Sequence, residues 1–203
     1  MRMCLSFSRH QDRVDKLVAR FGYFDCQIDH ELSNLIAALI WAVANQRLKV
    51  FVATYLFDET RWNKAKQLGW QIHLRKTFVR KALFPKTITY SWIVGYCPSQ
   101  ECLQEVINTG WNLSGNESFI MILSYDTANI LPKIGETYED DLGTLEFNEL
   151  KWIDFCPFVF SRDHDGLTLR LYTRDLDEDE LRQKVEFWLN SLGIDFSISI
   201  EPL

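Results

Sequence analysis

The chain has no acidic residue over a long internal stretch. Between positions 60 and 100 there is no Asp or Glu, although the whole chain holds 28 acids and has a net charge of −6. Eight bases occupy the same stretch: Arg61, Lys64, Lys66, Arg75, Lys76, Arg80, Lys81 and Lys86. From position 101 onward acids outnumber bases by 21 to 7. Three explanations stay open for segment 61–86: contact with the chain's own acidic part or plain surface, nucleic-acid binding, or a protein partner.

The motifs that identify common enzyme classes are also absent. There is no glycine-rich phosphate loop, no nucleophile elbow and no His-Glu-x-x-His sequence, and the four histidines are scattered. Cys97 and Cys102 are five positions apart. This spacing fits neither a zinc knuckle nor a thioredoxin-type redox pair. We therefore expect free, mostly buried thiols, no cofactor and no catalytic residues.

Long apolar runs are missing as well. The most apolar segment, 35–44, has ten residues, which is too short to cross a bilayer, and the N-terminus has no run of signal-peptide length. The sequence therefore predicts a cytoplasmic protein without a membrane contact. Few Gly (9) and Pro (5) beside 47% hydrophobic residues favour a packed core over disorder.

The first two-thirds of the chain, 1–130, predicts an α/β unit. Strands are expected at 21–26, 48–57, 70–74, 87–97 and 119–123. Helices are expected at 11–21, 29–45, 58–68 and 98–109, the third ended by Gly69. The strand at 48–57 is apolar almost throughout, which is typical of burial on both faces. Alternation of strands and helices favours a mixed, mostly parallel sheet with flanking helices, and a basic connection at 75–86.

The remainder, 144–203, predicts a smaller α+β unit. Three strands are expected at 144–150, 152–161 and 167–173. A helix follows at 177–192, begun by a capping box of Asp177 and Glu180 and ended by Gly193. A C-terminal strand at 194–200 completes the unit. The polar, acidic segment 131–143 is the expected joint, and whether the two units pack as one domain stays open.

Carboxylates could meet at one edge of the expected sheet. Asp126 follows the strand at 119–123, and Asp25 or Asp29 follows the first strand. Ligands of open α/β sheets bind outside the carboxyl ends of the strands, where two carboxylates could hold Mg²⁺ for phosphodiester hydrolysis. The bases expected to contact phosphates are Arg75, Lys76, Arg80 and Lys81.

This order of elements resembles the NYN branch of the PIN-like ribonucleases. The matching segments are 47–55, 68–74, 86–96 and 119–134. That family carries acids in the middle strand and a Ser-Gly-Asp-x-Asp turn. Here the middle strand has no acid, and the turn keeps Ser124 and Asp126 but has Tyr125 and Ala128 at the other two places. The resemblance implies a degenerate metal site that binds nucleic acid without cleaving it.

The favoured interpretation is a non-catalytic protein that binds another protein. Missing catalytic motifs, a heavy aromatic content and an acidic C-terminal part fit an immunity or inhibitor protein that neutralises a basic partner, such as a nuclease toxin. The expected contact residues are Glu139, Asp140, Asp141, Asp163, Asp165, Asp177, Glu178 and Asp179. The alternative is a nucleic-acid-binding protein or a degenerate, metal-dependent ribonuclease of the PIN/NYN type.

Overall fold

The structure is a computed structural model that describes residues 2–9, 17–24, 30–45, 47–56, 63–81, 87–111, 120–124, 156–162 and 168–198. The strands are β1 (Arg2–Arg9), β2 (Leu17–Phe24), β3 (Lys49–Leu56), β4 (Gln71–Lys81), β5 (Thr87–Cys97), β6 (Ile120–Ser124), β7 (Phe158–Arg162), β8 (Thr168–Thr173) and β9 (Asp195–Ile198). The helices are α1 (His30–Ala44), α2 (Asn63–Gln67), α3 (Gln100–Trp111) and α6 (Glu178–Ser191). The expected α/β content is therefore confirmed.

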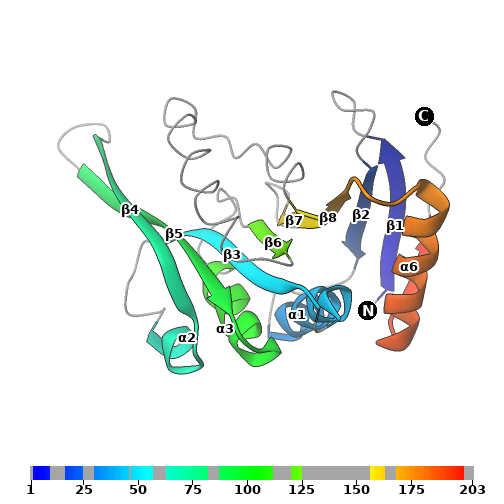
Figure 1. The fold of residues 1–203 in the computed structure, drawn as a ribbon, viewed down its shortest axis with the longest axis horizontal. Helices are drawn as coiled ribbons and strands as arrows, with labels where there is room; N and C mark the ends of the chain where they lie inside the picture. The colour runs from blue at the N-terminus through cyan, green and yellow to red at the C-terminus, as the bar shows by residue number, and fades with distance from the viewer. Residues whose placement is uncertain are drawn as a thin grey trace.

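The described strands form one sheet in the order β4-β5-β3-β6-β7-β8-β2-β1-β9 (Figure 1). Of the eight neighbouring pairs, only β1 and β9 run parallel. The expectation of a mostly parallel sheet is therefore wrong. The expectation rested on apolar strands alternating with helices, but β3, the central example, pairs antiparallel with both β5 and β6.

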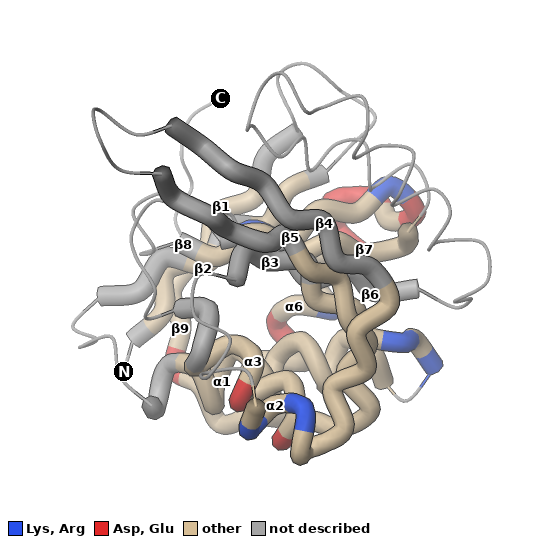
Figure 2. The backbone as a smooth tube through the Cα atoms, turned by 90° about the vertical axis from the view of Figure 1, so that its left-hand side faces the viewer, with Lys and Arg blue, Asp and Glu red and all other residues tan. Residues whose placement is uncertain are grey.

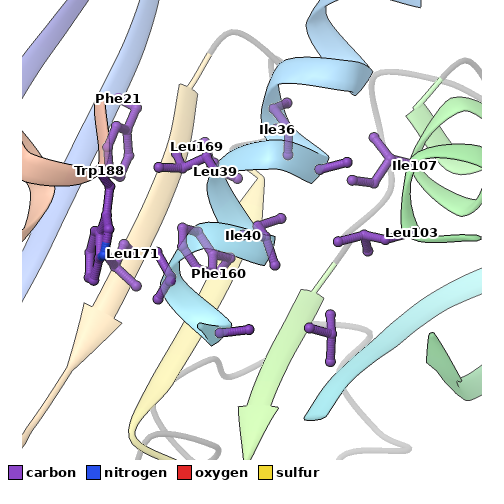
Figure 3. Packing of buried hydrophobic residues seen from close by; sticks show 14 of the residues in the cluster. Phe21, Ile36, Leu39, Ile40, Leu103, Ile107, Phe160, Leu169, Leu171 and Trp188 are labelled. Atoms are coloured by element: carbon purple, nitrogen blue, oxygen red, sulfur yellow. The ribbon is translucent and has the colours of Figure 1, made fainter. Parts of the chain in front are cut away.

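The four helices of the described residues lie together on one face of this sheet, as Figure 2 shows. Alternate residues of the strands point toward them, and Leu5 of β1 pairs with Phe21 of β2 on that face. Within this layer α1 lies between α3 and α6 and contacts both (Figure 3). The core beneath the helices includes Leu5, Phe21, Ile36, Leu39, Ile40, Leu103, Ile107, Phe160, Leu169, Leu171 and Trp188.

The opposite face of the sheet is also buried at its centre. Phe51, Val94 and Val159 are fully buried there, and each alternates along its strand with a residue of the helix-side core. The Phe51 ring lies 5.7 Å from the ring of Tyr96 and 6.2 Å from that of His73, measured between centroids. Burial of β3 on both faces, as its apolar run predicts, is confirmed.

Two local expectations are wrong. The helix expected at 11–21 is replaced from Leu17 by β2, which pairs with β1 and β8. The expected connection at 75–86 is strand as far as Lys81, because β4 continues to that residue and pairs with β5 along its length. In both places a partner strand takes up the hydrogen bonds of the backbone. The local sequence does not show which distant segment will be that partner.

The predicted helix ends are confirmed. Gly69 and Gly193 both have a positive φ, 96° and 67°, which glycine adopts without a steric cost. At the end of α2, the Trp70 N–H donates to the Ala65 carbonyl and the Gly69 N–H to the Lys66 carbonyl, which is a Schellman motif. Among the described helices, none is long and apolar enough to span a membrane.

The first two strands are built into the sheet beside the last ones. β2 pairs with β8, and β1 pairs with β9, so the first and last described strands are neighbours in one sheet. The expected joint at 131–143 and the strand expected at 144–150 lie outside the described residues. The strand expected at 152–161 is described from Phe158 onward as β7.

Candidate protein-binding face on α6

Helix α6 begins at a complete capping box. The Glu180 N–H donates to Asp177 Oδ1 at 2.8 Å, and the Asp177 N–H donates to Glu180 Oε2 at 3.1 Å. Both bonds give a partner to a backbone N–H group that would otherwise have none at the start of an α-helix. At the other end, the Ile194 N–H donates to the Leu189 carbonyl and closes the helix. The sequence therefore fixes both ends of α6.

The inward side of α6 anchors the helix to the sheet. Leu181, Val185 and Leu189 are fully buried, and the Trp188 ring meets the Phe158 ring edge-on at 6.1 Å. The Arg182 guanidinium lies 5.1 Å from the centre of the Phe7 ring on β1. These contacts hold α6 across several strands and leave its outward side toward solvent.

The outward side of α6 combines acids with an exposed aromatic ring. Phe187 is 69% exposed, the largest value for a big hydrophobic residue among those described. Gln183 and Glu180 lie one and two turns before Phe187 on the same side of the helix, and both are exposed. We define the α6 face as the exposed residues Asp175, Asp177, Asp179, Glu180, Gln183, Lys184, Phe187 and Asn190.

Most acids of this face have a local structural role. Asp177 and Glu180 form the cap, and Asp175 lies 3.1 Å from Arg174. The half-buried Glu178, next to this face, lies 3.8 Å from Arg182. Asp179 makes no such pair with any described residue. The ion pairs are exposed and contribute little to stability, so the carboxylates remain open to solvent and to a partner. The helix dipole also favours acids here, which accounts for part of the cluster.

The predicted acidic contact residues fall into two groups. Asp177, Glu178 and Asp179 lie together at the start of α6. Five others lie outside the described residues: Glu139, Asp140, Asp141, Asp163 and Asp165. Phe187 was not among the residues predicted from the sequence. The spacing of Leu181, Val185, Trp188 and Leu189 would have shown that Phe187 lies off the buried stripe.

The four bases predicted to contact phosphates lie on one strand. Arg75, Lys76, Arg80 and Lys81 are all in β4, which is an end strand of the described sheet and pairs there only with β5. Charged residues, Lys above all, are common on edge strands because they oppose pairing with another chain. This arrangement offers a structural reason for the acid-free stretch beside any binding role.

The predicted metal ligands Asp25, Asp29 and Asp126 lie outside the described residues. Within the described part of the chain, no group of three or more His, Cys, Asp or Glu side chains could hold a metal ion. Searches of protein-family models, of curated proteins and of solved structures give no match for this chain. The candidate site therefore rests on its own geometry.

Proposed function

We propose that this protein is a non-catalytic binding module that takes a basic protein partner on the α6 face. The observation that carries the proposal is the exposure of Phe187 on a helix whose start is acidic and whose inward side is fixed in the core. An immunity or inhibitor protein that neutralises a basic nuclease toxin has this chemistry: acids that attract the partner and an aromatic anchor that holds it.

The charge arrangement supports an outside partner for these acids. β4 with its bases lies at one end of the sheet, while α6 packs on β2 and β9 at the other end (Figure 1). The backbone of β4 and the start of α6 therefore lie at opposite ends of the nine-stranded sheet. Interactions between charges more than about 10 Å apart are largely screened at 0.1 M salt. The carboxylates of α6 therefore remain able to attract a basic partner.

Phe187 would contribute to the affinity for the partner, whereas the acids would raise the association rate. Burying an exposed Phe side chain contributes about 1.5–3 kcal/mol, which is the scale of an interface anchor. Exposed carboxylates mainly raise the association rate and set its salt dependence. Changes at Phe187 should therefore act mainly on the dissociation rate, and changes at the acids mainly on the association rate.

The test starts with capture by the native chain and by Phe187→Ala, followed by binding kinetics with the partner so identified. Phe187→Ala is expected to speed dissociation, and the reversal of Asp175 and Asp179 to Lys to slow association and flatten its salt dependence. Asp177 and Glu180 stay unchanged, so that the cap remains intact.

The matched controls are Leu68→Ala, which removes the other exposed large hydrophobic side chain of the described residues, and Glu101→Lys, which reverses an exposed first-turn acid of α3. Both should leave the kinetics unchanged. The proposal is wrong if the α6 variants bind as the native chain does, or if the controls lose as much binding.

A second candidate function is nucleic-acid binding, and the alignment of four bases along β4 favours it. Arg75→Glu with Arg80→Glu should abolish binding of a single-stranded oligonucleotide at low salt. If the native chain binds no oligonucleotide under those conditions, this candidate is removed. Cleavage that depends on Mg²⁺ or Mn²⁺ and is lost in Asp126→Ala would instead support the ribonuclease form.

A further inference from the structure

The nine-stranded sheet ends on one side in the long strand β4 (Figure 1). β4 has 11 residues and, among the described strands, pairs with β5 alone. A register shift between Ile72 and Leu74 marks a bulge near its start. From Leu74 to Lys81 the pairing with β5 continues without a further shift. This regular segment, 74–81, is therefore the part of the edge to which a further strand can be added.

The backbone of an edge strand suits a peptide better than a nucleic acid. Alternate residues of β4 form hydrogen bonds with β5, and the residues between them direct their N–H and C=O groups toward the other side. The segment 74–81 extends over roughly 25 Å at about 3.3 Å per residue. An extended peptide matches this row because its backbone carries both donors and acceptors. The phosphates of a nucleic acid are acceptors only, so they would leave the carbonyl groups of the edge without donors.

The charges of β4 select the strand that can be added. The four bases occupy two pairs of positions, 75–76 and 80–81, and no acid lies between positions 60 and 100. Consecutive positions of a strand belong to opposite faces of the sheet, so each face has one base near either end of the segment. β5 contains no acid and therefore places no carboxylate opposite these positions. An added strand with acids at the same spacing would meet a base across from each acid.

A second copy of β4 does not fit this edge. If two copies paired antiparallel about Phe78, position 75 of one would oppose position 81 of the other, and position 76 would oppose position 80. Like charges directly opposite one another destabilise a sheet. The bases thus protect the edge against its own copies and leave it open to a strand of opposite charge. At the other end of the described sheet, β9 has four residues and no base, so it lacks this selectivity.

We propose that the segment 74–81 of β4 binds an acidic, extended segment of another protein by adding it to the sheet as a further strand. Backbone hydrogen bonds hold the added strand, and the bases of β4 select acids over other sequences. This site is separate from the α6 face, because α6 packs on β2 and β9 at the opposite end of the sheet. The two sites therefore take partners of opposite charge and can be tested independently.

The test measures binding of a fluorescent peptide, Glu-Glu-Val-Thr-Thr-Glu-Glu, to the full chain by anisotropy at low salt. Its acids have the spacing of the β4 bases in either direction. Two further peptides keep every side chain but carry backbone N-methyl groups, one on the second, fourth and sixth residues and the other on the third, fifth and seventh. In an added strand only one of these sets directs its N–H groups toward β4. One N-methylated peptide should therefore bind at least about tenfold more weakly, and the other should bind within about twofold of the parent peptide.

Charge exchange on the protein tests the role of the bases. Arg80→Glu with Lys81→Glu should weaken binding of the acidic peptide at least about tenfold, and a peptide with Lys in place of one of its two Glu pairs should restore it. The matched control is Arg47→Glu with Lys66→Glu, which changes the net charge equally at two exposed bases outside β4 and should leave binding within about twofold. Circular dichroism establishes that each variant is folded.

Three results would overturn the proposal. Equal binding of the two N-methylated peptides would show that charge alone attracts the peptide. Loss of binding in the control variant as large as in the β4 variant would place the site elsewhere. If the native chain binds no acidic peptide, strand addition is excluded, and binding of a single-stranded oligonucleotide at the same salt would then assign the bases to nucleic acid.

Discussion

Gly95 of β5 supports the indole of Trp70, and replacing it gives a sharp test of the packing. A methyl group added at Gly95 would meet the indole nitrogen of Trp70 and lie 2.5 Å from its Cε2. It would also lie 3.0 Å from the carbonyl oxygen of Gln71, which belongs to the backbone of β4. Trp70 is buried, so its ring has little room to move.

The size of the effect follows from two opposing contributions. Alanine in a strand is favoured over glycine by about 0.5–1 kcal/mol, because glycine loses more backbone entropy on folding. Overpacking a core costs about 1–3 kcal/mol, and contacts on a ring and on backbone place Gly95→Ala near the upper value. We therefore expect a net loss of about 2 kcal/mol, which lowers the Tm of a domain of this size by about 4–8 °C.

Urea denaturation of a double-mutant cycle measures the cause directly. Trp70→Phe removes the part of the indole that the new methyl group would meet, so Gly95→Ala should cost at least about 1 kcal/mol less in that background. Costs that add within about 0.5 kcal/mol would refute the assigned contact. A Gly95→Ala variant as stable as the native chain would refute it as well.

Two further predictions concern helix ends and are checked by thermal and urea denaturation. Asp177→Ala should cost about 1 kcal/mol by removing the cap of α6, whereas Asp179→Ala, outside the capping box, should cost less than half of that; equal losses would contradict the capping role. Gly69→Ala should lower the Tm more than Gly193→Ala. Both residues have a positive φ, but only at Gly69 does the added methyl group approach Pro98 Cγ, at 3.1 Å. The reverse order would contradict this reasoning.

The strand direction could not be predicted from the apolar pattern of β3. Val50, Phe51 and Val52 are consecutive and fully or almost fully buried, as the sequence indicates. Burial on both faces is typical of parallel sheets, but it does not require them. In this protein both neighbours of β3 run antiparallel to it. The side-chain pattern therefore reports the environment of the strand, while direction depends on pairing with distant segments.

Elements that depend on local signals could be predicted from the sequence, and elements that depend on pairing with distant strands could not. The capping box at Asp177 and the glycine ends of α2 and α6 depend on neighbouring residues only, and they were predicted. In β2, the spacing of Leu17 and Val18 after Val14 fits a helix as well as a strand. Pairing with β1 and β8 decides for the strand.

The candidate site also has one part that the sequence predicts and one part that only the fold shows. The acids at the start of α6 are visible in the sequence, but their relation to the basic segment depends on the sheet order. Because β4 and α6 occupy opposite ends of the sheet, contact between these two charged regions cannot explain both of them. The bases of β4 have a sufficient local reason in edge protection, and capping explains only part of the acids on α6. Phe187 is exposed beside those acids and has no role in the core, which makes α6 the stronger candidate for an interface.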